Sequence, residues 1–111
     1  MLPECTVLLR SNGAFPLSLP CPDRTVEGGY VGDLLSWVMG GAKEGDAWVT
    51  IMSNVNVLAV ASLCDVACVL LAQGVTLGEK ELQTAREKKI NVLSAADPAF
   101  EVCMKIGAIL P

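Results

Sequence analysis

The sequence predicts an α/β fold, with a small, mostly parallel sheet and helices on its faces. Three observations support this class. Segments typical of strands and helices alternate in the order β-α-β-α-β-α over the C-terminal two-thirds of the chain. Residues 67–72 form a continuous apolar run, which is typical of a strand buried on both faces of a parallel sheet. Hydrophobic residues make up 52% of the 111 positions, so the chain can form a core around that sheet.

Residues 1–22 are interpreted as a Pro-rich N-terminal arm that precedes an α/β domain over residues 23–111. Residues 6–9 can form a first strand, because Thr and Val are followed there by two leucines. Three prolines argue against regular structure between residues 15 and 23, since proline lacks a backbone N–H and restricts the residue before it. The arm is expected to lie over the domain or over a partner.

A strand and a helix follow the arm. Residues 24–30 predict a short strand. Asp33 can cap a helix over residues 34–39, where apolar side chains share one face. The pair Gly40-Gly41 is expected to end that helix. β-favouring residues at positions 47–52 then predict the next strand.

The rest of the chain completes the alternation. Its predicted elements are strands at residues 67–72 and 90–94 and helices at residues 57–63, 79–89 and 98–106, the last ended by Gly107. Residues 53–56 supply caps for the first of these helices. Thr76 and Glu79 have the spacing of a capping box for the second. Asp97 is expected to cap the third, with Pro98 at its first position.

The composition excludes several classes of function. The chain has no histidine, which excludes Ser-His-Asp and Cys-His catalysis and histidine metal sites. Eight basic and twelve acidic residues give a net charge of −4, which argues against a nucleic-acid binder. The uncharged run at residues 47–64 contains Thr, Ser and Asn, so a buried strand and helix explain it better than a membrane span.

The five cysteines are an odd number, and no two have the Cys-x-x-Cys spacing. A zinc site of four cysteines normally uses two close pairs, so none is expected. The cysteines are interpreted as reduced, mostly buried thiols, which fits a reducing cytoplasm. Neither a metal ion nor a cofactor is predicted, and no residue is assigned a catalytic role.

Three segments carry a resemblance to a known family. They are GGYVGDLLSWVM at residues 28–39, GDAWVTI at residues 45–51 and NVLAVASL at residues 56–63. Together they resemble the DRTGG domain in its short, stand-alone form and, more distantly, the N-terminal domain of HPr kinase/phosphorylase. Longer proteins carry the DRTGG domain next to CBS domains, as in certain family II pyrophosphatases. Relatives usually open with a helix before the first strand, whereas the N-terminal arm here has no helical period.

The resemblance implies an α/β fold, a tendency to dimerise and a regulatory or ligand-sensing role without established catalytic residues. The stand-alone form is often encoded with iron hydrogenase and related redox proteins. A kinase activity is disfavoured because the chain lacks a G-x-x-x-x-G-K-[ST] loop to hold phosphate. We expect a non-enzymatic regulatory or interaction module, a homodimer with a redox or hydrogenase-related protein partner. The alternative is a small-ligand sensor that binds an adenine nucleotide.

The carboxyl ends of the predicted strands define a candidate ligand site, because ligands bind beyond these ends in open parallel sheets. The loops that follow the strands hold the candidate residues Ser53, Asn54, Asn56, Gly74 and Thr76. Free backbone N–H groups at the adjacent helix N-termini would favour an anion such as a phosphate. The same side chains can instead serve only as helix caps.

Trp37 and Trp48 are two of only five aromatic residues. Core packing is one interpretation of both. Tryptophan is enriched at protein interfaces, and only 18% of the chain is charged. We therefore expect at least one of the two to lie at a subunit contact.

Overall fold

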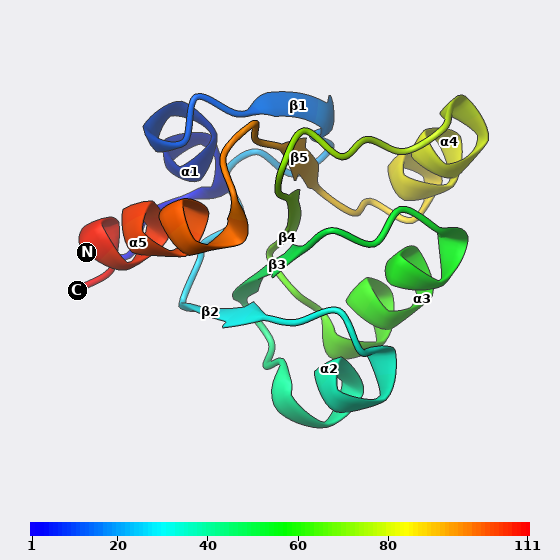
Figure 1. Cartoon of the computed structure of the whole chain (residues 1–111), viewed down its shortest axis with the longest axis horizontal. Helices are drawn as coiled ribbons and strands as arrows, with labels where there is room; N and C mark the ends of the chain where they lie inside the picture. The colour runs from blue at the N-terminus through cyan, green and yellow to red at the C-terminus, as the bar shows by residue number, and fades with distance from the viewer.

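A sheet of five strands forms the centre of the computed structural model, which describes residues 1–111. The strands are β1 (Phe15–Ser18), β2 (Gly28–Val31), β3 (Asp46–Thr50), β4 (Cys68–Leu71) and β5 (Val92–Ser94), and the helices are α1 (Cys5–Ser11), α2 (Leu35–Gly41), α3 (Val55–Cys64), α4 (Glu79–Glu87) and α5 (Ala99–Ile109). The strand order is β1-β5-β4-β3-β2 (Figure 1). Strands β2 to β5 run parallel, and β1 pairs antiparallel with β5. The predicted α/β class with a mostly parallel sheet is confirmed.

The sheet separates two hydrophobic cores, because successive side chains of a strand face opposite sides. On one side, Cys68 and Leu70 of β4 pack with residues of α1 and α5. On the other side, Val69 and Leu71 pack with residues of α2, α3 and α4. Every residue of β4 is buried, as the apolar run at residues 67–72 predicts. The structure is therefore a three-layer arrangement of helices, sheet and helices (Figure 1).

The predicted strands and helices from residue 47 onward are all present. Each helix of this region lies between two parallel strands in the chain, except α5, which follows β5. Asn54 caps α3 as predicted, since its Oδ1 accepts a hydrogen bond of 2.9 Å from the Asn56 N–H. None of the helices is both long enough and apolar enough to cross a membrane.

The first strand predicted at residues 6–9 is wrong, because this segment lies in helix α1. Cys5 and Leu8 are three residues apart and lie on the same helix face, where both are fully buried. The Cys5 N–H donates to the Arg24 carbonyl at 2.9 Å and thereby attaches the helix to the chain that precedes β2. Tertiary packing overrides the strand propensity of the segment. The expected departure from DRTGG domains is also wrong, since a helix does precede the first strand.

The prediction that prolines prevent regular structure between residues 15 and 23 is wrong at β1. Pro16 lies within this strand and pairs in register with Leu93 of β5. An edge strand tolerates proline, because the missing N–H can face away from the neighbouring strand. The register shifts between Pro16 and Ser18, so the pairing is irregular at this point. The N-terminal segment thus contributes an edge strand to the sheet.

Asp33 does not cap α2, contrary to the prediction. Its Oδ1 instead accepts hydrogen bonds from the Thr50 hydroxyl at 2.7 Å and from the Ile51 N–H at 3.0 Å. The residue at the N-cap of α2 is Leu34. Asp33 therefore joins the loop after β2 to the end of β3.

Other predicted helix boundaries are also wrong. Helix α4 begins after Gly78 with no side-chain cap, so Thr76 and Glu79 do not form a capping box. Asp97 pairs with Lys105 at 2.7 Å, and the N-cap of α5 is Pro98. Helix α2 does end at the predicted Gly40-Gly41 pair, since Gly41 is its last residue, whereas α5 continues past Gly107 to Ile109.

Candidate functional site

The carboxyl ends of β2, β3, β4 and β5 lie along one edge of the sheet, because these four strands are parallel. Backbone hydrogen bonds connect the loops beyond them. The Ala72 N–H donates to the Thr50 carbonyl at 3.0 Å, and the Gly74 N–H donates to the Ala95 carbonyl at 2.7 Å. The loops that contain the predicted ligand residues therefore lie at the same edge as the end of β5.

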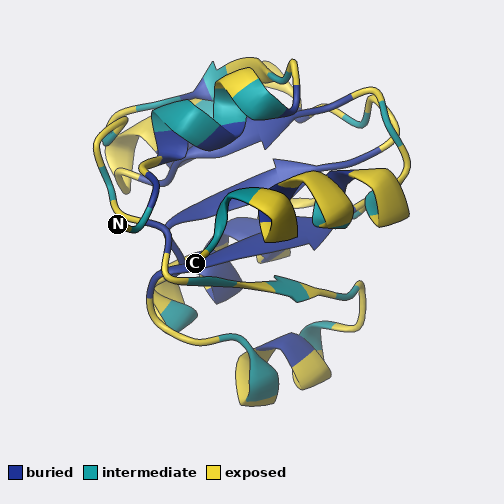
Figure 2. Cartoon of the chain, turned by 90° about the vertical axis from the view of Figure 1, so that its left-hand side faces the viewer, coloured by how far each residue is buried: buried dark blue, intermediate teal, exposed yellow.

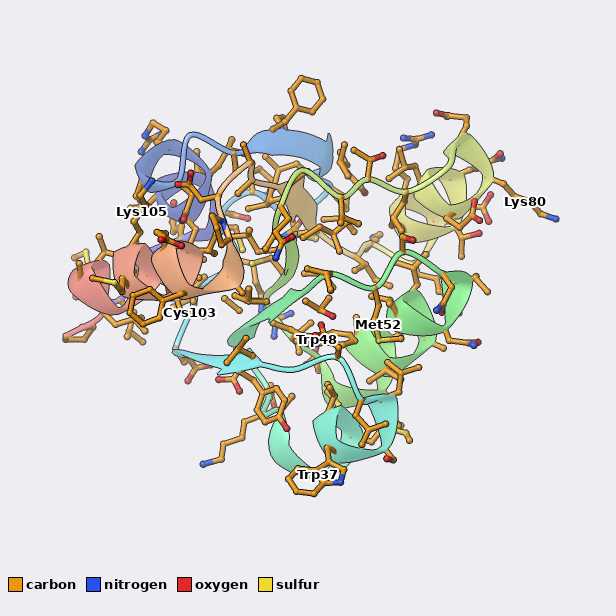
Figure 3. All side chains as sticks on the ribbon, in the orientation of Figure 1. Trp37, Trp48, Met52, Lys80, Cys103 and Lys105 are labelled. Carbon is orange, nitrogen blue, oxygen red and sulfur yellow. The ribbon has the colours of Figure 1, made fainter.

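Ser53, Asn54 and Asn56 are exposed at the start of α3. The Asn54 side chain is engaged as the helix cap, which leaves Ser53 and Asn56 with side chains directed to solvent. A groove of about 250 Å³ lies beside this turn and is lined by Val55, Lys80, Glu81 and Thr84. Lys80 extends outward from α4 (Figure 3). The region offers a helix N-terminus and the cation of Lys80, which favour an anion, and the carboxylate of Glu81 in the same lining, which opposes one.

Gly74 and Thr76 lie on the loop between β4 and α4. Gln73 and Gly74 both have positive φ angles, of 59° and 72°. Gly74 also donates its N–H within the protein, so that this group is not free for a ligand. Thr76 is exposed. The Ser94 hydroxyl donates to the Val75 carbonyl at 2.7 Å and ties the loop to β5.

A second groove lies between β2 and α5, away from the predicted ligand residues. Its volume is about 230 Å³, and its lining is mostly apolar: Gly29, Tyr30, Val31, Ala47, Val49, Cys103, Ile106, Gly107 and Leu110. Gly107 leaves open space, because no atom lies within 4 Å of the position that a Cβ would take. Burial raises the pKa of the Cys103 thiol at this groove. Gly107 is the feature of the sequence that marks this groove, although the sequence alone predicts it to be the end of a helix.

Large apolar side chains are exposed on β2, on the helix that follows it and on α5, which contacts β2 from the opposite face of the sheet. They are Val31 at the end of β2, Leu34, Trp37 and Met39 at α2, and Phe100 and Met104 on α5. Trp37 is 72% exposed and projects away from the protein (Figure 3). Trp48 is fully buried, and its Nε1–H donates to the Gly32 carbonyl at 2.9 Å. The two tryptophans therefore differ, because only Trp37 is available to a partner.

Strand β2 differs from the central strands in burial as well. Its residues are half-buried or exposed, whereas all residues of β3 and β4 are buried (Figure 2). β2 pairs only with β3 and has no neighbour on its other side. The edge strand, the apolar residues around it and the adjacent groove define a surface that we call the β2 edge.

No protein-family model and no curated protein matches this chain. Its fold is similar to that of a solved structure, the CBS and DRTGG domains of the regulatory region of Clostridium perfringens pyrophosphatase in complex with the activator diadenosine tetraphosphate. The TM-score is 0.78 at 17% sequence identity, and the match covers 94% of this chain and 46% of that chain. This chain thus has a fold that is also found in a regulatory region, and it spans less than half of the solved chain that it matches.

Proposed function

We propose that this chain is a non-enzymatic regulatory module of the DRTGG type, which works as a homodimer through the β2 edge. The observation that carries the proposal is the group of exposed apolar side chains around an unpaired strand. Contiguous apolar patches on protein surfaces are typical of interaction sites. The similarity in fold to a regulatory region supports a regulatory role.

A homodimer through this edge would bury groups that are costly to leave in water. Val31, Trp37 and Phe100 present large apolar side chains on the two faces beside β2. The strand itself carries backbone groups that lack a partner strand, and a second copy can satisfy them by pairing edge to edge. A two-fold symmetric contact of this kind uses the same patch on both copies.

Sedimentation velocity over a range of micromolar concentrations tests the proposal. Trp37→Ser should shift the wild-type dimer toward monomer, because tryptophan is often a dominant contact residue. Phe15→Ser is the matched control, since Phe15 is also an exposed aromatic residue, 68% exposed, but lies on β1 at the opposite edge. Equal effects of the two substitutions, or a wild-type chain that stays monomeric, would contradict the proposal.

An adenine-nucleotide sensor is the second candidate function. The strand ends that meet near the start of α3 favour it, together with the groove beside Lys80. The regulatory region of similar fold was solved with diadenosine tetraphosphate, an adenine nucleotide. Ser53, Asn54 and Asn56 would contact the phosphates, with Gly74 and Thr76 on the neighbouring loop.

Thermal-shift measurements with ATP, ADP and diadenosine tetraphosphate test this candidate. Asn54→Asp keeps a good helix cap but places a negative charge where a phosphate would bind. It should therefore abolish nucleotide stabilisation while leaving the melting temperature of the free protein nearly unchanged. Asn56→Ala, at an exposed position, should weaken the same response. If none of the nucleotides stabilises the wild type, this candidate fails and the interaction module remains.

The protein partner that we propose is a redox or hydrogenase-related protein in a reducing cytoplasm. Support comes from the resemblance to stand-alone DRTGG domains and from the five free cysteines. Titration of the chain against a purified iron hydrogenase, monitored by light scattering, should give a complex. Trp37→Ser should be included, since it distinguishes a partner that binds at the β2 edge from one that binds elsewhere.

A further inference from the structure

The helices α1 and α5 cover their face of the sheet incompletely. The main strand contacts of α5 are with β2 and β3. The groove between α5 and β2 is lined by Gly29 and Gly107, neither of which has a side chain to fill it. A Cβ at Gly107 would have no atom within 4 Å, and a Cβ at Gly29 would come no closer than 3.6 Å to another group. This face is therefore open between α5 and the free edge of β2.

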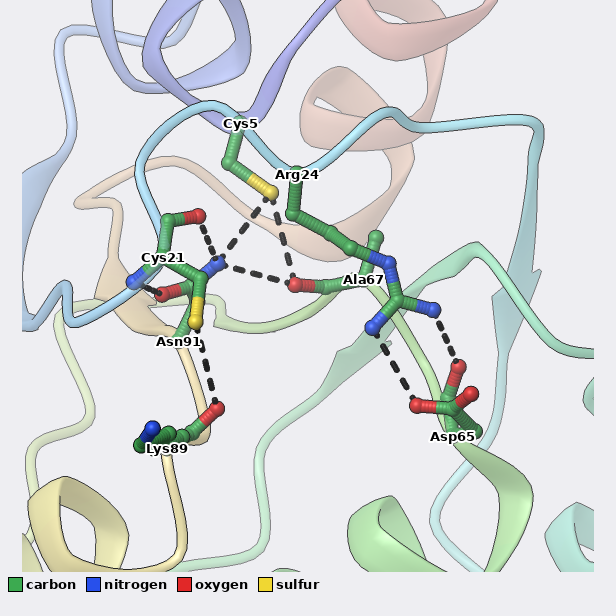
Figure 4. A network of polar contacts seen from close by, with 7 residues as sticks. All are labelled: Cys5, Cys21, Arg24, Asp65, Ala67, Lys89 and Asn91. Carbon is green, nitrogen blue, oxygen red and sulfur yellow. Dashed lines mark hydrogen bonds and ion pairs between the residues drawn. The ribbon is translucent and has the colours of Figure 1, made fainter.

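The other part of the face is closed by the chain itself. The loop between β1 and β2 is hydrogen-bonded to the amino ends of β4 and β5 through Asn91, which is buried. Asn91 Nδ2 donates to the carbonyls of Cys21 at 2.7 Å and of Ala67 at 3.1 Å, and the Cys21 N–H donates to Asn91 Oδ1 at 2.9 Å (Figure 4). The side of this face toward β5 is thus covered, and the side toward β2 is open.

Helix α5 carries an apolar stripe along the border of the groove. Its members stand at positions i, i+3, i+4 and i+7 of the helix and so share one side: Phe100, Cys103, Met104 and Gly107. Phe100 is 72% exposed and Met104 is 59% exposed. The charged residues Glu101 and Lys105 lie farther round the helix. The stripe is therefore uncharged, although the chain carries a net charge of −4.

The stripe is complementary to itself under a two-fold axis. When two copies of α5 lie antiparallel, residues equally far before and after the axis face each other. An axis between Cys103 and Met104 thus places Phe100 of one copy opposite Gly107 of the other. Phe100 is the largest side chain of the stripe, and the groove beside Gly107 has a volume of about 230 Å³. A phenyl ring fits this space, since an apolar cavity of about 150 Å³ holds benzene.

We propose that α5 packs against α5 of a second copy, with Phe100 of each copy seated in the groove beside Gly107 of the other. The contact rests on the proposed homodimer and identifies what would cover its open groove. Because neighbouring strands lie about 4.8 Å apart, pairing of two β2 strands would bring helices that lie over β2 and β3 to about 10 Å from each other. Helices in contact lie about 8–10 Å apart. An uncharged stripe also spares two acidic chains the repulsion of like charges.

Substitutions at the two facing positions test the proposal. Phe100→Ala empties the groove and Gly107→Leu fills it, so each should weaken the wild-type dimer about tenfold or more. Phe100 is exposed and Gly107 adjoins open space, so both variants should fold, as circular dichroism checks. Ala108→Leu is the matched control, because it adds the same side chain at an exposed position on a different side of α5. Sedimentation equilibrium should give the wild-type dissociation constant for this control.

A mixture of the two variants distinguishes this contact from a general apolar one. In a mixed dimer, Phe100 of the Gly107→Leu copy meets the unaltered Gly107 of the Phe100→Ala copy. The introduced leucine meets the position from which the phenyl ring was removed. An equimolar mixture should therefore associate about tenfold more tightly than either variant alone. This rescue requires that positions 100 and 107 face each other across the axis.

The outcomes separate the α5 contact from the homodimer itself. A wild-type chain that stays monomeric would contradict both. A wild-type dimer that Trp37→Ser weakens but neither α5 variant weakens would overturn the α5 contact and leave the homodimer in place. Weakening by both α5 variants without rescue in the mixture would likewise overturn the contact, because Phe100 and Gly107 would then lie apart in the dimer.

Discussion

The two edges of the sheet are built in different ways. At one edge, β1 contains Pro16 and an irregular register with β5. At the other edge, β2 contains neither and pairs in regular register with β3. Proline and irregular pairing are devices by which proteins keep an edge strand from pairing with another chain. The β2 edge lacks both.

The exposed apolar residues are also distributed unequally between the two edges. Phe15 is the one large apolar residue of β1 that is exposed, whereas Val31, Trp37 and Phe100 are exposed from three elements around β2. The apolar groove between β2 and α5 lies on that side as well. The comparison indicates that the β1 edge is protected and that the β2 edge is available for a partner.

The largest loss of stability is expected from substitution of Trp48, the buried side chain that is hydrogen-bonded to the loop after β2. Trp48→Ala removes a fully buried indole and its hydrogen bond to Gly32. The free energy of unfolding should fall by about 3–5 kcal/mol, as measured by urea denaturation. Trp37→Ala, at an exposed position, should change monomer stability by less than about 0.5 kcal/mol. Similar losses for both would mean that Trp37 is part of the fold rather than of a contact surface.

The second effect concerns association at the two edges. Val31→Lys places a charge at the end of β2, where the side chain is exposed, and should weaken the dimer about tenfold or more because edge charges oppose strand pairing. Phe15→Lys at the other edge should leave the dimer unchanged. Sedimentation equilibrium measures both dissociation constants. An unchanged constant for Val31→Lys would place the contact elsewhere.

A smaller effect is expected from filling the groove beside β2. Gly107→Ala puts a methyl group into open space within α5. Alanine favours a helix more than glycine does, so thermal unfolding of the monomer should show a gain of up to about 1 kcal/mol. If a partner side chain enters the groove, the same substitution weakens association. A loss of monomer stability would show that the groove is not open.

The smallest change in monomer stability is expected from replacing the proline of β1, the protected edge strand. Pro16→Thr restores a backbone N–H on β1 and adds a β-favouring residue. Monomer stability should change by less than about 0.5 kcal/mol, while light scattering should detect new, concentration-dependent association. If no association appears, Pro16 does not protect the edge.

The sequence predicts the central part of the fold better than its edges. The run at residues 67–72 identifies β4 because a strand buried on both faces is apolar throughout. Helix α1 and strand β1 are mispredicted because tertiary contacts determine them: Cys5 and Leu8 face a core that local propensity does not describe. Pro16 is tolerated only because β1 lies at an edge, and the order of strands in the sheet is a property of the whole chain.

The candidate sites differ in the same way, because some can be located from the sequence and others cannot. The strand-end loops can be located from the sequence, since the alternation of strands and helices fixes where parallel strands end. The Asn54 cap is likewise a local feature. The groove at β2 is formed by residues far apart in the chain. The helical position of Gly107 was the one local sign of the groove, and glycine is more often a helix end.

Hydrogen–deuterium exchange at two protein concentrations tests the central claim most directly. The account predicts that amides of β2 become more protected as the concentration rises from far below to far above the dissociation constant, while amides of β1 do not change. Peptides that cover residues 27–32 and 14–18 report on the two strands. Equal protection of β2 at both concentrations, with the chain associated at the higher one, would contradict the assignment of β2 as the contact edge.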